Sequence, residues 1–309
     1  LPLEKEEKER LEREEFEEKG FVANLERLLL AVDESPNARF ASRIAGLLAG
    51  ARGIPTTVLH LGPQAKAQEK RRADEASHET TVKNAAKVSA EIEKGDGEEV
   101  REIDVTTRSR QKKAADAVVD EARKGFDLLV VGLNKVIGAG GGFDRNVEIV
   151  TAGFDGPLAV VAAKGHHLTR PDSDGLRILV PVSGSGVSRR GAEVAVALAR
   201  SSSHPLRVIY VTTTRDKGRR RRNVSVSLFE EEAILKETIA LAARYDVEVI
   251  TTLRTNTAPE AAILQEMRDS NIDLVVMGVD RIEGDGLNFG SVAAEVLREA
   301  EGSVLLVSN

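Results

Sequence analysis

Residues 126–132 read FDLLVVG, and residues 272–278 read IDLVVMG, a closely similar apolar run that returns 146 residues later. A second pair of stretches repeats at nearly the same offset: LERLLLAVDESPNARFA at 25–41 is matched by GLRILVPVSGSGVSRRGA at 175–192. Self-similarity at a fixed offset is the signature of a repeated structural unit. The sequence therefore predicts that the chain contains one domain twice.

Each unit alternates short apolar runs with amphipathic stretches. Strands that are apolar throughout and alternate with helices are typical of a parallel sheet covered by helices on both faces. We therefore expect the α/β class, with two tandem doubly wound domains that each contain a five-stranded parallel sheet. Strands are expected at 28–32, 56–62, 99–108, 126–132 and 157–163 in the first unit, and in the second at a run ending at Val182 and at 206–212, 247–254, 272–278 and 303–308.

The domain boundaries follow from the repeat. We expect a first domain at 21–165 and a second at 175–309, joined by a linker at 166–174 that contains Pro and Asp. Residues 1–20 contain nine Glu and five Lys or Arg, several of them paired at i,i+4. This pattern predicts a solvated linker helix ahead of the first domain.

Two helix starts carry capping signals. Ser35 directly precedes Pro36, as an N-cap residue followed by proline at the first helical position does. Thr257 and Glu260 have the spacing of a capping box. We expect helices to begin directly after Ser35 and Thr257.

Composition excludes several classes of function. The 309 residues carry 44 basic and 50 acidic side chains, a net charge of −6, so no general positive field is present to hold nucleic acid. Eight Phe, two Tyr and no Trp argue against a surface on which bases stack. The chain has no cysteine, which excludes disulfides, thiolate catalysis and thiolate-bound metal. The five histidines lack metal-binding spacing, so no metal is expected.

The second unit has an anion-binding pattern after its fourth strand. Ligands of doubly wound sheets bind at the carboxyl ends of the strands, and amides at a helix N-terminus bind anions. Gly278 ends the fourth strand, Arg281 follows in the loop, and Gly290, Ser291 and Val292 begin the next helix. These residues predict a phosphate cradle, although an ordinary strand–loop–helix connection with a Ser cap explains them as well.

The first unit has other residues at the corresponding places. Asp33 ends its first strand, where the second unit has Ser183, and Gly132 and Lys135 follow its fourth strand. An Asp at this position can accept a hydrogen bond from an adenine amino group or a ribose hydroxyl, or it can cap the next helix. Asp144 stands at the start of the helix after the fourth strand, where a carboxylate caps the helix but repels phosphate.

These residues together resemble the universal stress protein family in its tandem two-domain form, over nearly all of the chain after residue 20. Members bind adenine nucleotides when they carry an Asp after strand one and, after strand four, Gly, two residues, Gly, nine residues, then Gly with Ser or Thr. The second unit keeps Gly278, Gly290 and Ser291, but Arg281 replaces the middle Gly and the loop is one residue shorter. The first unit keeps its Asp and first Gly but has Lys135 for the middle Gly.

The resemblance implies a set of nucleotide-binding residues. The family places the walls of the adenine pocket at strands one and two, here Val182 with Val211, or Val32 with Leu61. The implied ligand is an adenine nucleotide (ATP, ADP or AMP), with no metal required. The residues implied are Pro181, Val182, Ser183, Val211, Gly278, Arg281, Gly290, Ser291 and Val292 in the second unit, and Val32, Asp33, Leu61 and Gly132 in the first. The second unit retains the phosphate-binding pattern best.

The resemblance also implies partners. Tandem pairs of this kind occur as cytoplasmic tails of bacterial cation–proton antiporters, and a chain that begins at Leu1 with a charged helix resembles such a tail. We expect a non-enzymatic regulatory pair that senses an adenine nucleotide and modulates a membrane transporter portion of the same polypeptide, at the cytoplasmic face of the inner membrane. The family further implies a pseudo-dimer through the last strands, at 157–163 and 303–308, and a homodimer of chains. A stand-alone cytoplasmic stress protein, a ligand-free assembly module and an ATP-hydrolysing enzyme are the alternatives.

Overall fold

The computed structural model describes residues 20–62, 68–93, 102–109, 113–139, 141–173, 175–212, 224–282 and 286–309. These residues form a ten-stranded sheet in the order β3-β2-β1-β4-β5-β10-β9-β6-β7-β8. The first half contains β1 (Leu28–Val32), α2 (Pro36–Gly50), β2 (Thr56–His60), α3 (Gln68–Glu93), β3 (Val105–Ser109), α4 (Ala114–Ala122), β4 (Leu128–Gly132), α5 (Arg145–Thr151) and β5 (Leu158–Ala162). The predicted linker helix at 1–20 lies outside the described residues, apart from Gly20.

The second half repeats this order after a short 3₁₀ helix. Its elements are η1 (Gly165–Leu168), β6 (Ile178–Val182), α6 (Gly186–Ala199), β7 (Leu206–Thr212), α8 (Val224–Ala243), β8 (Val249–Thr255), α9 (Pro259–Asp269), β9 (Leu274–Gly278), α10 (Gly290–Glu299) and β10 (Ser303–Ser308). Within each half all neighbouring strands are parallel.

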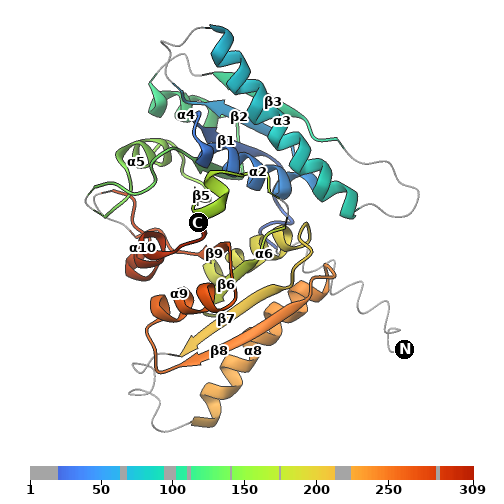
Figure 1. Cartoon of the computed structure of the whole chain (residues 1–309), viewed down its shortest axis with the longest axis vertical. Helices are drawn as coiled ribbons and strands as arrows, with labels where there is room; N and C mark the ends of the chain where they lie inside the picture. The colour runs from blue at the N-terminus through green and yellow to red at the C-terminus, as the bar shows by residue number, and fades with distance from the viewer. Residues whose placement is uncertain are drawn as a thin grey trace.

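Helices cover both faces of the sheet (Figure 1). α2, α3, α6 and α8 lie over one face, and α4, α5, α9 and α10 lie over the other. Two hydrophobic clusters correspond to these layers: the first includes Phe40 of α2 and Val194 of α6, and the second includes Val118 of α4 and Val296 of α10. The predicted architecture, two tandem doubly wound α/β domains, is confirmed.

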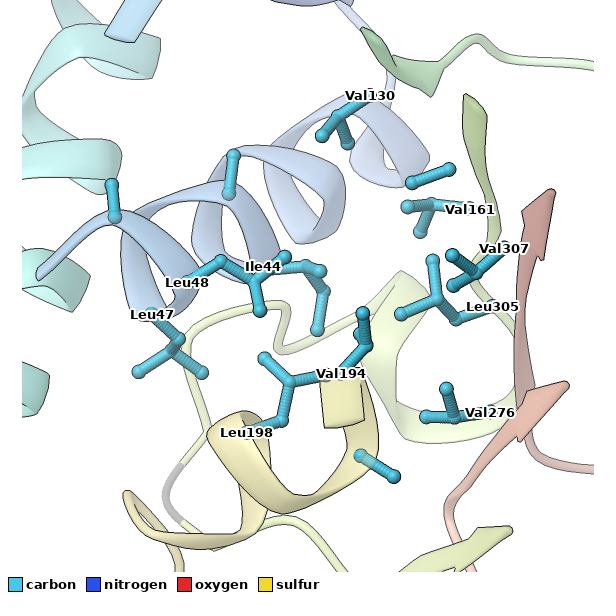
Figure 2. Packing of buried hydrophobic residues seen from close by; sticks show 14 of the residues in the cluster. Ile44, Leu47, Leu48, Val130, Val161, Val194, Leu198, Val276, Leu305 and Val307 are labelled. Carbon is cyan, nitrogen blue, oxygen red and sulfur yellow. The ribbon is translucent and has the colours of Figure 1, made fainter. Parts of the chain in front are cut away.

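The two halves join through their last strands, as the resemblance implied. β5 and β10 pair antiparallel, with Val160 opposite Leu306 at the middle of the register. Both strands are buried along their whole length, because helices of both halves cover the two faces. Figure 2 shows the side chains over this joint on one face: Val161, Leu305 and Val307 of the paired strands lie beneath Ile44, Leu47 and Leu48 of α2 and Val194 and Leu198 of α6. The joint is therefore a continuous part of the core.

The two predicted helix caps have different outcomes. Ser35 caps α2, and its Oγ accepts a hydrogen bond from the Ala38 amide at 3.2 Å. The capping box at Thr257 is wrong, since α9 has Ala258 at its N-cap position, without a side-chain cap, and begins at Pro259. Proline favours the first helical position because its fixed φ suits a helix and its missing N–H needs no partner there. Pro259 therefore fixes the start of α9.

The segment predicted as a linker packs against both domains. His167, within η1, is completely buried. Its ring stacks on Phe40 of the first half, with centroids 4.0 Å apart, and its Nδ1 lies 2.8 Å from Ser303 Oγ of the second half. The segment therefore fixes the two halves to each other as well as connecting them.

Acid should destabilise the fold through His167. Burial lowers the pKa of His167 from its ordinary 6.5 to about 3, so the folded chain keeps the ring neutral while the unfolded chain protonates it below pH 6.5. The unfolded state then binds more protons, and the free energy of unfolding falls as the pH drops from 6.5 towards 3. This group contributes at most about 1.4 kcal/mol per pH unit. Urea denaturation between about pH 7 and about pH 4 measures the slope.

Two variants isolate the contribution of this ring. His167→Asn keeps a polar group near Ser303 but removes the titration, so its stability should fall less steeply in acid than that of the wild type. Leu168→Ala changes an exposed neighbour that does not titrate and should keep the wild-type slope. Equal slopes for wild type and His167→Asn would contradict the assignment.

Candidate functional site

A hollow of about 340 Å³ opens at the carboxyl edge of the sheet in the first domain. Parallel strands end on the same side of a sheet, so residues that are distant in the sequence gather there. The lining comprises Asp33 after β1, Leu61 and Gly62 after β2, Ala114 of α4, Leu133, Asn134 and Lys135 after β4, and Asn146 and Val150 of α5. Two predicted site residues, Asp33 and Leu61, thus share one hollow with Lys135.

Asp33 links two sides of this hollow. Its Oδ2 accepts a hydrogen bond from the Asn134 amide at 2.7 Å, which connects the end of β1 to the loop after β4. Its Oδ1 accepts from the Ser35 amide at 3.0 Å and from the Ser35 hydroxyl, while Ser35 caps α2. Asp33 therefore supports the cap at Ser35 and is not itself the N-cap of α2. Ligand binding is compatible with this role, because a carboxylate offers about four acceptor positions and described residues occupy three of them.

Lys135 brings a positive charge to the hollow, and its side chain is exposed. The start of α5, on the other side, is less suited to an anion. Asp144 caps this helix as predicted, with Oδ1 accepting from the Asn146 amide at 2.9 Å. A carboxylate thus occupies the place where a helix N-terminus would attract a phosphate. An anionic group bound here would have to meet Lys135 instead.

The residues predicted as the second domain's cradle have three different surroundings. Gly290 has a φ of +85°, a conformation that favours glycine, and its amide donates to Asn288 Oδ1 at 2.8 Å. Ser291 is exposed but does not cap α10, whose N-cap residue is Phe289. Val292 packs against the second hydrophobic cluster.

The end of β6 also bonds within itself. Pro181 and Val182 are the last two residues of this strand. The Ser183 amide donates to Ser188 Oγ at 2.8 Å, and Ser183 Oγ lies 3.1 Å from Ser185 Oγ. Ser183 therefore makes bonds with the start of α6, whereas Asp33 bonds across the edge to the fourth strand's loop.

This architecture also occurs in known proteins. The profile described as "Universal stress protein family" matches residues 24–143 and 176–308, one match in each half. The chain belongs to the universal stress protein family. Among solved structures, a universal stress protein from Archaeoglobus fulgidus DSM 4304 is 15% identical, covers 92% of this chain and 98% of its own, and has a TM-score of 0.56. A functionally unknown protein from Pseudomonas aeruginosa PAO1 is 14% identical, covers 93% and 94%, and has a TM-score of 0.53. No curated protein matches the sequence.

The expected adenine walls of each universal stress domain lie on opposite faces of the sheet. Val32 is fully buried in the cluster with α2, whereas Leu61 belongs to the cluster on the other face. The reason is the strand period of two: Val32 pairs with His60, so the residue after His60 points the other way. Leu61, and not Val32, therefore lines the hollow.

The same correction applies to the second domain. Val182 pairs with Tyr210, so Val211 points to the opposite face. Val182 lies in the cluster with α2 and α6, and Val211 packs against the other cluster. These two valines cannot be the two walls of one pocket.

Gly132 and Gly278 end β4 and β9 and allow helices to pack closely there. A Cβ at Gly132 would lie 2.2 Å from the Cβ of Ala41 in α2. A Cβ at Gly278 would lie 1.8 Å from the Val187 carbonyl oxygen in α6. Helix packing therefore explains both glycines without a bound phosphate.

The loops after β4 and β9 contact each other between the two universal stress domains. Phe143 and Phe289 occupy corresponding places before α5 and α10, and their rings pack edge-to-face with centroids 5.3 Å apart. Arg281 Nη2 donates to the Thr151 carbonyl oxygen at the end of α5, at 3.3 Å. Arg281, predicted to face a nucleotide, thus reaches the other domain.

No sequence pattern singled out six residues of the hollow. Gly62, Leu133 and Asn134 lie next to predicted residues, whereas Ala114, Asn146 and Val150 come from helices that directly follow β3 and β4. The chain order could have indicated Ala114 and Asn146, because α4 and α5 must begin at the edge where β3 and β4 end.

The described part of the chain offers neither a metal cluster nor a spanning helix. Within it, no group of three or more His, Cys, Asp or Glu is placed to hold a metal ion. Among its helices, none combines the length and the apolar character needed to cross a membrane.

Gly278→Ala is expected to lower the free energy of unfolding by about 3 kcal/mol, because the added Cβ overlaps the Val187 carbonyl and pushes α6 away from β9. Gly186→Ala is the matched control, since nothing lies within 4 Å of a Cβ there. Alanine favours a helix, so this control should be neutral or up to about 1 kcal/mol more stable. Urea denaturation measures both. If Gly278→Ala is as stable as wild type, close packing does not explain this glycine.

Proposed function

We propose that this chain is a regulatory pair of universal stress domains that binds an adenine nucleotide (ATP, ADP or AMP) and has no catalytic chemistry of its own. The hollow of the first domain carries the proposal. It brings a carboxylate, an apolar side chain and a cation together at the carboxyl edge, in Asp33, Leu61 and Lys135.

Each of these groups suits one part of a nucleotide. The Asp33 carboxylate can accept from a ribose hydroxyl or an adenine amino group. Leu61 offers apolar surface to the base, and the Asn146 side chain adds hydrogen-bonding groups. Lys135 supplies charge for phosphate, in place of the helix amides that Asp144 takes. The first domain is favoured over the second because Asp33, Leu61 and Lys135 share one hollow, whereas Arg281 bonds to the Thr151 carbonyl of the other domain.

We further propose that the nucleotide signal reaches a cation–proton antiporter portion of the same polypeptide at the cytoplasmic face of the membrane, with the chain as a homodimer. This proposal is supported by the resemblance of the tandem pair, with the charged residues 1–20 ahead of it, to the cytoplasmic tails of antiporters. A ligand shifts a conformational equilibrium only if it binds the two states with different affinity. At about 100 times its dissociation constant it can stabilise the preferred state by about 2.7 kcal/mol. The hollow includes α5, and Arg281 of the second domain contacts the end of that helix.

Calorimetric titration of ATP, ADP and AMP tests nucleotide binding. We expect the wild type to release or absorb heat on binding. Asn146→Glu should bind at least about tenfold more weakly, because the new carboxylate enters the hollow and repels phosphate. Ser291→Glu is the matched control, because Asn146 and Ser291 are the second residues of α5 and α10. An acidic residue suits a helix N-terminus, so both variants should fold.

The pattern of losses separates the alternatives. Loss in Ser291→Glu and not in Asn146→Glu would transfer the site to the second domain. No heat with any nucleotide up to about 1 mM, in a folded wild type, would leave the pair as a ligand-free assembly module. ATP turnover in the presence of magnesium would contradict the non-enzymatic assignment.

The antiporter proposal has a separate test. The reading frame that encodes this chain should continue upstream of Leu1 into a series of membrane-spanning helices. A start codon directly before Leu1 would instead make this a stand-alone stress protein.

A further inference from the structure

Buried polar groups behind the first domain's hollow form a hydrogen-bonded chain. His78 of α3 and Ser42 of α2 are 2% and 0% exposed. His78 Nε2 lies 2.8 Å from the Asp33 carbonyl oxygen, and His78 Nδ1 lies 2.9 Å from Ser42 Oγ. Ser42 Oγ also lies 2.9 Å from the Ala38 carbonyl oxygen. The chain ends at Asp33, a residue of the hollow.

The protons of this chain can be arranged in two ways. A carbonyl oxygen only accepts, so His78 Nε2 carries a proton and donates to Asp33 in both. With a neutral ring, Nδ1 has no proton, and the Ser42 hydroxyl donates to it. With a protonated ring, Nδ1 donates to Ser42 Oγ, and the hydroxyl turns to donate to Ala38. Each ring nitrogen is hydrogen-bonded in both states, so proton uptake needs only the rotation of one hydroxyl.

We propose that His78 is a proton-binding site that couples pH to the hollow through Asp33. Protonation makes the bond from Nε2 to the Asp33 carbonyl charge-assisted, and such bonds are shorter and stronger. The Asp33 carboxylate holds the Asn134 amide, so the change reaches the loop next to Lys135. The effect on a nucleotide rests on the proposed function, whereas the effect on Asn134 does not.

Charged groups from all the surrounding elements act on this site. Asp33 after β1, Arg39 of α2 and His60 at the end of β2 act on His78 itself. Glu34 after β1 and Asp74 and Glu75 of α3 act on the neighbouring His60. Burial, the largest influence, lowers the pKa of His78 below its ordinary 6.5, and the bond to the Asp33 carbonyl opposes this. The His60 ring, 5.9 Å away between centroids, lowers it further. His78 therefore takes up its proton at a lower pH than an exposed histidine does.

The expected direction follows from charge. A proton on His78 places a cation beside the hollow, so an anionic ligand should bind more tightly in acid. Linkage is reciprocal, and the same ligand should raise the pKa of His78. A coupling of ordinary size changes affinity by about fivefold or more.

Nuclear magnetic resonance on the ligand-free chain tests the coupling itself. We expect the Asn134 amide shift to follow the titration of the His78 ring with the same midpoint. In His78→Gln this titration should vanish from the Asn134 amide, while in His166→Gln, a change of an exposed ring, it should persist. An Asn134 amide that ignores the His78 titration overturns the proposal.

Ser42→Ala tests the hydroxyl in a variant that keeps the histidine. The protonated ring then loses the acceptor for Nδ1–H, so the midpoint of His78 should move to lower pH. Because alanine suits a buried helical position, this variant also guards against misfolding of His78→Gln. An unchanged midpoint in Ser42→Ala would contradict the proton arrangement.

Calorimetry with adenosine 3′,5′-cyclic monophosphate tests the effect on a ligand, because its phosphodiester keeps one charge over the range used. Between about pH 7.5 and a pH below the His78 midpoint found by resonance, the wild type should bind about fivefold more tightly in acid, and His78→Gln should bind equally at both. The same pH dependence in both proteins overturns the coupling to the hollow. No binding at either pH would show that the hollow does not take this cyclic nucleotide; the titration of Asn134 then decides the proton site, and the titrations with ATP, ADP and AMP decide the nucleotide site.

Discussion

The antiparallel pairing of β5 with β10 is the interaction on which the rest of the molecule depends. Each domain has an apolar last strand, and such a strand left at an open edge exposes unpaired backbone groups and invites association. Pairing the two strands closes both edges at once. The register, in which Val160 pairs with Leu306, then determines which other elements come into contact between the domains. α2 packs on α6, and the Phe143 ring contacts the Phe289 ring. The buried His167 and the contacts of Lys164 with the end of α10 follow from this joint.

Around this fixed joint the two repeats have diverged in chemistry. Asp33 bonds across the edge to the loop after β4, while its counterpart Ser183 bonds within the start of α6. Lys135 lines a hollow, while its counterpart Arg281 crosses to α5. The first domain thus places a carboxylate and a cation at its hollow. In the second domain, the serine at the first position bonds to its own helix, and the arginine at the second position bonds to the first domain. A ligand in the first hollow would touch the helix that the second domain contacts.

Sequence patterns located the strands well because most of them are buried on both faces. β4 and β9 leave continuous apolar runs, and their predicted and observed positions differ by about two residues at one end. β3 lies at an edge and buries alternate residues, so its apolar signal is weak and it begins later than predicted, at Val105. Local rules also placed the cap at Ser35, but at Pro259 the backbone preference of proline outweighed the capping box.

The sequence by itself determined the duplication, the α/β class and the edge at which Asp33 and Leu61 would appear, because these depend on apolar periodicity and chain order. Only the tertiary structure decided which of the predicted residues share a hollow. Val32 and Leu61 point to opposite faces because of a one-residue offset in register. Gly278 is required because the backbone of α6 packs too closely against it for a Cβ. The partners of Arg281 and His78 come from other elements, more than a helix away in the chain. Contacts of this kind depend on the packing of the whole sheet, which no local pattern records.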